Sequence, residues 1–319
     1  MAKKIFIGFV ALVLVAFVLL FQFGGRAAEE LTKKLLAEQT ALQGTLKAEE
    51  IQANWSGDVI FKNVVWVGPD GKTIAEIPLA TVSVNLFDAL LKGGTGASVG
   101  DVVIDKPSFF VSYNKKDGLN IVNYINFQVE EEQKNNELLT VKKAAAATQF
   151  RGLMEIKDAK VNLLLENKPL DFDKVQFQGN FKQYPKIKYG LRVKDGKSDI
   201  IADIQNDSGT TAVVAEVKKM PLQNILNVLP QAADVVITEG NLPDVKIRAD
   251  KADDKWTLNI DGTIDGLKGS LINYPVTKGS GKFSADTEAL KFAGLNLELA
   301  GQTVVIDGNV YYAEKPEAK

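Results

Sequence analysis

The chain of 319 residues carries 38 basic and 40 acidic side chains, and its net charge of −2 gives no basic field for nucleic acid. It contains neither cysteine nor histidine. Disulfides, Ser-His or Cys-His nucleophiles and the usual zinc, copper and haem ligand sets are therefore excluded. Carboxylates alone can catalyse, as in glycosidases, but no spacing of acidic residues singles out a pair. We expect a protein that is not an enzyme, with no catalytic residue, no metal site and no cofactor.

The N-terminus is marked by an unbroken apolar run at residues 5–21, with Lys3 and Lys4 just before it. Extended through Gln22 and Phe23, the run provides about 19 helical residues. These reach roughly 28 Å, close to the ~30 Å hydrocarbon core of a bilayer. We therefore predict a cytoplasmic tip and a single-pass anchor in residues 1–26, with the remainder exported. The alternative is a cleaved signal peptide, although the run is longer than the ~7–15 residues usual in such peptides.

Changes in composition divide the rest of the chain into four segments. Residues 27–50 have leucines at helical spacing and predict a stalk helix. Residues 51–127 predict a first β region. Residues 128–149 are highly charged and then alanine-rich, which predicts a linker or an exposed helix. Residues 150–319 predict a second β region.

Period-two alternation of apolar and polar residues dominates the two β regions. Residues 175–181, 187–193 and 256–264 alternate cleanly. Such regular alternation favours a mostly antiparallel sheet with one apolar and one solvated face. Turn signals divide the strands at residues 207–209, 265–266 and 279–281. Short helices are predicted at residues 87–91, 119–125 and 221–229.

Four glycines recur in similar local sequences: Gly179, Gly240, Gly262 and Gly308. A glycine inside a strand permits a bulge or a stronger twist. The alternative interpretation is ordinary hairpin punctuation.

The sequence leaves two ways of covering the apolar faces of a mostly β protein. The faces can close on each other as a β-sandwich or barrel, and the patterning alone slightly favours this closed core. Alternatively, the chain forms a long twisted antiparallel sheet that is curled into an apolar groove. Long helices that could cover a sheet of many strands are scarce in the predicted elements.

Three stretches of the first β region carry a resemblance to a known family. Trp55-Ser56-Gly57 stands before residues 61–64, residues 77–91 read IPLATVSVNLFDALL, and residues 104–121 contain Asp-Lys-Pro followed by Asp117-Gly118. These stretches follow a predicted anchor and a predicted short helix. In this arrangement the chain resembles the N-terminal portion of AsmA-like and TamB-like proteins.

The resemblance implies a bridge-like lipid-transfer protein with a β-groove. Such a protein is anchored in the bacterial inner membrane, stands in the periplasm and carries phospholipid towards the outer membrane, which contributes to envelope biogenesis. The implied partners are phospholipid, the inner membrane and envelope or outer-membrane proteins. The alternative function is an anchored periplasmic scaffold or assembly factor that docks partner proteins by β-strand addition.

The predicted lipid-contacting residues come from the cleanest alternating sets. They are Val82, Val84, Phe109, Val111, Phe177, Phe181, Ile187, Tyr189, Leu191, Val193, Trp256, Leu258 and Ile260.

Overall fold

The structure is a computed structural model. It describes residues 42–54, 57–84, 99–114, 116–124, 152–183, 185–194, 196, 198–207, 209–222, 235–252, 255–271 and 273–311. Most of these residues lie in β-strands, so the predicted mostly β class is confirmed. Among them, no helix is both long and apolar enough to cross a bilayer.

Several sequence predictions fall outside the described residues. They concern the membrane anchor, the linker at residues 128–149, the helix at residues 87–91 and most of the helix at residues 221–229. The helix predicted at residues 119–125 is shorter than expected, because Leu119 belongs to a strand and α4 spans Asn120–Asn123.

The chain divides into two compact units, Met1–Ile187 and Lys188–Lys319, which we call unit 1 and unit 2. Unit 1 thus holds strands from both sides of residues 128–149. Its strands are β1 (Thr45–Lys47), β2 (Glu50–Ala53), β3 (Asp58–Val67), β4 (Thr73–Val84), β5 (Val99–Asp105), β6 (Ser108–Asn114), β7 (Gly118–Leu119), β8 (Leu153–Leu165) and β9 (Lys168–Asn180).

The stalk helix predicted for residues 27–50 is wrong at its C-terminal end, where β1 and the start of β2 are extended. Gly44 has a φ of 92°, a left-handed conformation that breaks a helix. Leu46 then pairs with Trp66 of β3 and is buried. Burial of Leu46 against the sheet therefore outweighs the helix propensity of the preceding segment.

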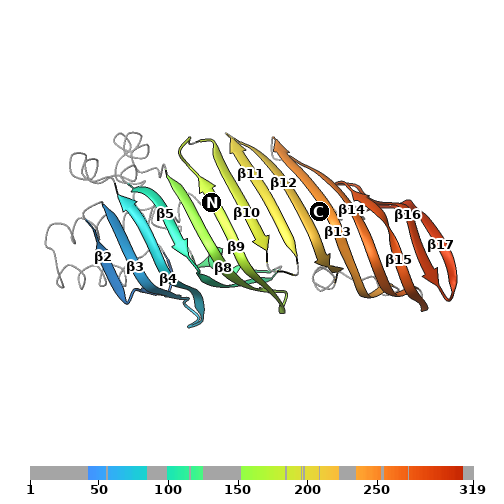
Figure 1. The fold of residues 1–319 in the computed structure, drawn as a ribbon, viewed down its shortest axis with the longest axis horizontal. Coiled ribbons are helices and arrows are strands. Elements are labelled where there is room, and N and C mark those ends of the chain that lie inside the picture. The colour runs from blue at the N-terminus through green and yellow to red at the C-terminus, as the bar shows by residue number, and fades with distance from the viewer. Residues whose placement is uncertain are drawn as a thin grey trace, which may run out of the picture. The chain divides into compact units, whose positions relative to one another are not determined.

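Unit 1 contains a mixed sheet built around β4. Strand β3 pairs with β1, β2 and β4, all antiparallel. One part of β4 pairs with β5 and another part with β6. Strand β8 runs parallel to both β5 and β6, and β9 returns antiparallel to β8. Figure 1 shows β2 to β5 in blue to cyan, and β8 and β9 in green.

A line of irregular residues crosses the sheet of unit 1 at Pro78, in the middle of β4. Proline donates no hydrogen bond to a ladder, so a central strand accepts it only at an irregularity. The registers on both sides place Pro78 opposite Asn63 of β3 and opposite Lys106, which follows β5. Asn63 and Lys106 have φ values of 50° and 49°, and Asp158 of β8 has 49°. These positions shift the alternation of each strand by one residue.

The phase shift keeps apolar side chains on one face along the whole strand. In β3, Val59 and Phe61 lie before Asn63, Val64 and Trp66 lie after it, and all four are buried. The core of unit 1 is then formed by these residues together with Leu46, Ala48, Ile51, Ile74, Ala75, Ala80, Val82, Val102 and Ile104.

The segment around α4 packs on the core of unit 1. The indole Nε1 of Trp66 donates to the carbonyl oxygen of Gln43 at 3.0 Å, and the Gln43 N–H donates to the carbonyl of Tyr124 at 2.6 Å. Partial burial, with a smaller contribution from Asp70, raises the pKa of the Tyr124 hydroxyl. The segments around Gln43 and α4 therefore cover part of the apolar core of unit 1.

Unit 2 is a meander of long strands, drawn in yellow to red in Figure 1. From β11 onward each strand pairs antiparallel with the next. The strands are β10 (Ile187–Lys194), β11 (Asp199–Asp207), β12 (Thr210–Pro221), β13 (Val235–Ala252), β14 (Lys255–Leu271), β15 (Tyr274–Ala285), β16 (Ala289–Leu299) and β17 (Gln302–Tyr311).

Unit 2 uses the same kind of irregularity as unit 1, and there the pairing of β13 with β14 also contains a bulge between Asn241 and Val245. Its register places Pro243 of β13 opposite Lys219 of β12, which has a φ of 57°. The turn predicted at residues 207–209 is confirmed between β11 and β12. The turns predicted at residues 265–266 and 279–281 are wrong, because they lie inside β14 and β15. Gly266 has a φ of 63°, so its conformational freedom serves a bulge rather than a hairpin.

Candidate functional site

One face of the unit 2 sheet is apolar over many strands. In an antiparallel pair, residues directly opposite each other project from the same face. One row across β11 to β16 consists of Ile200, Val217, Val245, Gly262, Phe283 and Phe292. The next row consists of Ala202, Ala215, Ile247, Ile260, Ala285 and Leu290. A third row, across β11 to β14, consists of Ile204, Val213, Ala249 and Leu258. We call these three rows the apolar face.

The opposite face of the same strands is charged and solvated. Between the first two apolar rows, the intervening row across β11 to β16 reads Ile201, Glu216, Lys246, Asp261, Ser284 and Lys291. Lys218 forms an ion pair with Glu216 at 3.2 Å. Ion pairs between side chains that are this exposed contribute little to stability, but they indicate that this face is solvated.

The apolar face is half-buried rather than sealed. Most of its side chains have intermediate exposure. Their burial comes from neighbours in the same sheet, such as the cluster around Leu222, Leu242 and Val245. Extensive contacts within unit 2 join only strands that follow one another in the chain. Among the described residues of unit 2, no second layer therefore packs on the apolar face.

A glycine and an aromatic ring interlock at the centre of this face. Gly262 pairs with Phe283, and a Cβ on Gly262 would lie 2.6 Å from Cζ of the Phe283 ring. The absent side chain lets the ring lie flat across the neighbouring strand. Gly262, one of the four recurring glycines, therefore lies inside a strand. Its missing side chain leaves space for the Phe283 ring and does not form a turn.

Strand β10 places the hydroxyl of Tyr189 on the apolar side of the sheet. The Cβ position of Gly190 lies 3.6 Å from Oδ1 of Asp203, so Gly190 and Asp203 share the charged face. Tyr189 alternates with Gly190 and consequently lies on the apolar side. Burial raises the pKa of the Tyr189 hydroxyl above its ordinary value. The hydroxyl therefore stays neutral at physiological pH, as suits an apolar surface.

The structure brings the predicted site residues of unit 2 together. Leu258 and Ile260 lie in the rows of the apolar face, and Trp256 extends their line on β14 with 49% of its surface exposed. Tyr189, Leu191 and Val193 alternate along β10, with Val193 buried. Ile187, the first residue of β10, is half-buried and marks the end of unit 1.

The predicted site residues of unit 1 lie in a different environment. Val82 is 0% exposed in the core of unit 1, against which Phe109 and Phe181 also pack. Val111 and Phe177 are half-buried in β6 and β9. Val84 is the last residue of β4, and its side chain lies outside the described residues. We therefore restrict the candidate site to unit 2.

Sequence reasoning missed the part of the apolar face on β11, β12, β13, β15 and β16. Val217, Val245 and Phe283 belong to the same row as Gly262, and Phe292 continues it. The signal was present as alternation in each strand, but bulges interrupt it. In β16, Phe292 and Leu295 are three residues apart because Gly294 has a φ of 63°.

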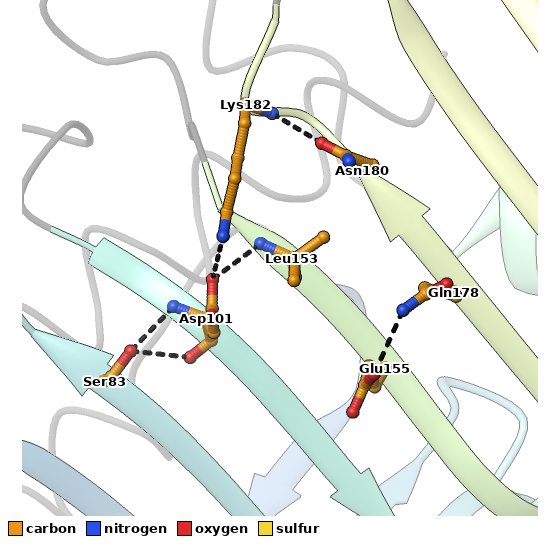
Figure 2. Close-up of polar contacts among 7 residues, drawn as sticks. All are labelled: Ser83, Asp101, Leu153, Glu155, Gln178, Asn180 and Lys182. Carbon is orange, nitrogen blue, oxygen red and sulfur yellow. Dashed lines mark hydrogen bonds and ion pairs between the residues drawn. The ribbon is translucent and has the colours of Figure 1, made fainter.

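A polar cluster around Asp101 lies in unit 1 and is structural. Figure 2 shows the Asp101 carboxylate between the backbone N–H of Leu153 and the ammonium of Lys182. The hydroxyl of Ser83 accepts from the Asp101 N–H at 2.6 Å and donates to the Asp101 carbonyl at 3.1 Å. These contacts join β4, β5 and β8 and leave no donor set aimed at a ligand.

Comparison with known protein families finds no family model that matches the chain, and a search of curated proteins finds no match. The interpretation of the apolar face therefore rests on its own chemistry.

Proposed function

We propose that this protein is a membrane-anchored, non-enzymatic lipid carrier. In this proposal the apolar face lines a groove in a curled sheet, and phospholipid moves along it with its acyl chains on the protein. The single observation that carries the proposal is an apolar face, across β11 to β16, that no described element covers. The opposite face of the same strands carries the charges.

The energetics of the sheet favour an apolar ligand. An apolar sheet face requires cover from another layer, a partner or a ligand. Acyl chains can provide that cover, and each buried CH₂ contributes about 0.8 kcal/mol. Such binding needs neither a deep pocket nor a catalytic group, which agrees with a chain that contains no histidine and no cysteine.

The cellular part of the proposal rests on sequence alone. The apolar run at residues 5–21 would anchor the protein in the bacterial inner membrane, with the residues after about 26 in the periplasm. The resemblance to AsmA-like and TamB-like proteins supports movement of phospholipid towards the outer membrane and a role in envelope biogenesis.

Photocrosslinking at neighbouring residues tests the proposal. A photoreactive phenylalanine analogue replaces Ile247, on the apolar face, or Arg248, on the charged face, in the full-length chain expressed in bacteria. We expect labelled phospholipid to crosslink at position 247 and not at position 248. Equal crosslinking at both positions, or none at position 247, would contradict a lipid-carrying face. Matched expression and melting temperature of the two variants control for folding.

The scaffold alternative has one specific observation in its favour, the exposure of β17. Val305 and Tyr311 are 56% and 71% exposed, and among the described strands β17 pairs only with β16. Asp307 is its one charged residue. Edge strands without lysine or proline are open to strand addition.

A pair of lysine substitutions tests strand addition at β17. Val305→Lys should release a partner captured by crosslinking in cells, whereas Val214→Lys should not. Val214 is the matched control because it is equally exposed, at 56%, but lies in β12 between β11 and β13. Equal loss of the crosslinked partner in both variants, or no loss in either, would argue against docking at β17.

A further inference from the structure

The apolar face ends at a row of different chemistry, beyond the row that contains Ala249. Cross-strand pairing places Asn206, Thr211, Lys251 and Trp256 side by side on β11, β12, β13 and β14. They share the face of the apolar rows because they follow in the same alternation. The Asn206 amide Nδ2 donates to Oγ1 of Thr211 at 3.4 Å. We call these four residues the head row.

The head row combines the groups that stabilise the interfacial part of a lipid. Lysine offers an ammonium on a flexible apolar stem, and threonine and asparagine offer neutral hydrogen-bond donors. Tryptophan favours the boundary between hydrocarbon and water, because its ring is apolar and its N–H is polar. Trp256 is half-exposed at this boundary, as such a role requires. A phosphate ester is the headgroup chemistry that a lysine and two neutral donors recognise.

The strand direction allows one acyl chain to run from the head row across the apolar rows. From Lys251 to Val245 there are 251 − 245 = 6 residues of β13, or about 20 Å at ~3.4 Å per residue. One leaflet of a bilayer is about 15 Å deep, half of the ~30 Å hydrocarbon core. An acyl chain of membrane length therefore fits the distance between the head row and the row of Val245.

The opposite end of these strands carries a buried apolar cluster. Beyond the bulge, Leu222 and Leu242 are buried and pack with Leu267. Trp256 and the neutral donors Asn206 and Thr211 lie at the other end of the strands, in the head row. We therefore place the headgroup at the head row.

We propose that the head row binds the phosphate of a phospholipid, with Lys251 as the charged contact and Trp256 beside the first acyl carbons. This inference rests on the proposed lipid-carrying function and assigns its headgroup site. The lipid then lies along the strands, with its headgroup at the ends of β11 and β13 that carry Asn206 and Lys251. Free phosphate shares this chemistry, so the experiment separates the two sources.

Competition for crosslinking tests the head row in the purified full-length chain. The photoreactive residue stands at position 258, and labelled phosphatidylglycerol is displaced by phosphatidylglycerol, by diacylglycerol with the same acyl chains, or by inorganic phosphate. We expect phosphatidylglycerol to compete about tenfold better than diacylglycerol, because a charge-assisted hydrogen bond is added. Lys251→Gln should abolish this preference and leave the affinity for diacylglycerol unchanged.

A lysine on the charged face provides the matched control. Lys246 lies opposite Glu216 and Asp261 on the neighbouring strands, and Lys246→Gln should keep the tenfold preference. Equal competition by the two lipids in the unmodified chain would overturn the head row, and so would a preference that survives Lys251→Gln. Competition by inorganic phosphate alone would assign a free-anion site instead. Absence of all lipid crosslinking would contradict the proposed function itself, so the two failures are distinguishable.

Discussion

The carboxylate of Asp101 accepts a hydrogen bond from the backbone N–H of Leu153 at 2.9 Å, although 52 residues separate them in the chain. Leu153 is the first residue of β8, and Asp101 lies in β5, to which β8 runs parallel. Figure 2 shows that Lys182 reaches the same carboxylate from beyond β9. Asp101 thus fixes the position where the chain re-enters the sheet of unit 1.

Removal of the Asp101 carboxylate should destabilise unit 1. Asp101→Ala leaves the N–H of Leu153 without its charged acceptor, and we expect a loss of about 1–2 kcal/mol in the free energy of unfolding. The side chain of Asp101 is 49% exposed, which keeps the expected loss below that of a fully buried bond. Denaturant unfolding followed by tryptophan fluorescence measures the loss, because Trp66 lies in the core of unit 1.

Lys182 supplies the control for this contact. Its ammonium lies 3.8 Å from the Asp101 carboxylate, and both side chains are about half exposed. Lys182→Ala should change the free energy of unfolding by less than about 0.5 kcal/mol. A loss as large as that of Asp101→Ala would assign the stabilisation to the ion pair rather than to the bond with the β8 backbone.

Two glycines of unit 2 that face phenylalanines should respond in opposite directions to alanine. Gly262→Ala places a Cβ 2.6 Å from the Phe283 ring and 3.1 Å from Cγ2 of Val245. The ring must shift, at a cost of about 1–3 kcal/mol. Gly308 pairs with Phe292, and a Cβ there meets no atom within 4 Å. Gly308→Ala should therefore stabilise the protein by up to about 1 kcal/mol.

Thermal unfolding of the two alanine variants separates packing from backbone effects. If both substitutions stabilise the protein, the close contact between Gly262 and Phe283 does not exist in solution. If both substitutions destabilise the protein, an alanine at position 308 of β17 makes an unfavourable contact that the open space around Gly308 does not predict.

The alternation of unit 2 was predictable from sequence, because the strand period of two is a local property. Leu258 and Ile260 were assigned to an apolar face, and the register places them there. The lengths of the strands were not predictable. The pattern predicted turns at residues 265–266 and 279–281, yet β14 and β15 run through both. A glycine at positive φ serves a turn and a bulge equally well, and only pairing with a neighbouring strand decides between them.

The environment of the predicted residues also depended on tertiary structure. Val82 and Leu258 alternate in the same way along their strands, but only Val82 is in a sealed core. Exposure is set by what packs on a face, and that information is not contained in the alternation of one strand. The irregularity at Pro78 could have been anticipated, since proline in a central strand indicates one.

Aspartate substitutions should distinguish the half-buried face of unit 2 from the core of unit 1. Leu191 is half-buried on β10, so Leu191→Asp should leave a folded protein that loses phospholipid crosslinking at position 247. Val82→Asp places a charge in a fully buried position and should unfold unit 1, at a cost of several kcal/mol. Circular dichroism, together with the crosslinking assay, measures both effects.

The informative result for Leu191→Asp is the combination of the two readings. A folded variant with unchanged lipid crosslinking would remove Leu191 from the lipid-contacting surface. A variant that unfolds as completely as Val82→Asp would indicate that a layer covers the apolar face on β10.

The hairpin between β15 and β16 should respond to acid through Asp286. Its Oδ2 accepts from the Lys291 ammonium at 2.8 Å, and its Oδ1 accepts from the N–H groups of Glu288 and Ala289 at 2.8 and 2.9 Å. Lys291 first, and then the two backbone donors, lower the pKa of Asp286 from 3.8 to about 2. A lowered folded-state pKa stabilises the protein above the unfolded-state value of 3.8, and this contribution is lost as the pH falls to about 2.

Comparison with two variants checks the sign and the cause of this dependence. The stability difference between the unmodified chain and Asp286→Asn should be constant above about pH 5 and should shrink between about pH 4 and pH 2. In Lys291→Gln, a carboxyl ¹³C titration should show the pKa of Asp286 moved towards its ordinary value. The pKa should remain lowered, because the two backbone N–H donors are still present. An unmoved pKa would assign the whole shift to the turn backbone, and a pKa near 4 in the unmodified chain would contradict the hairpin contacts themselves.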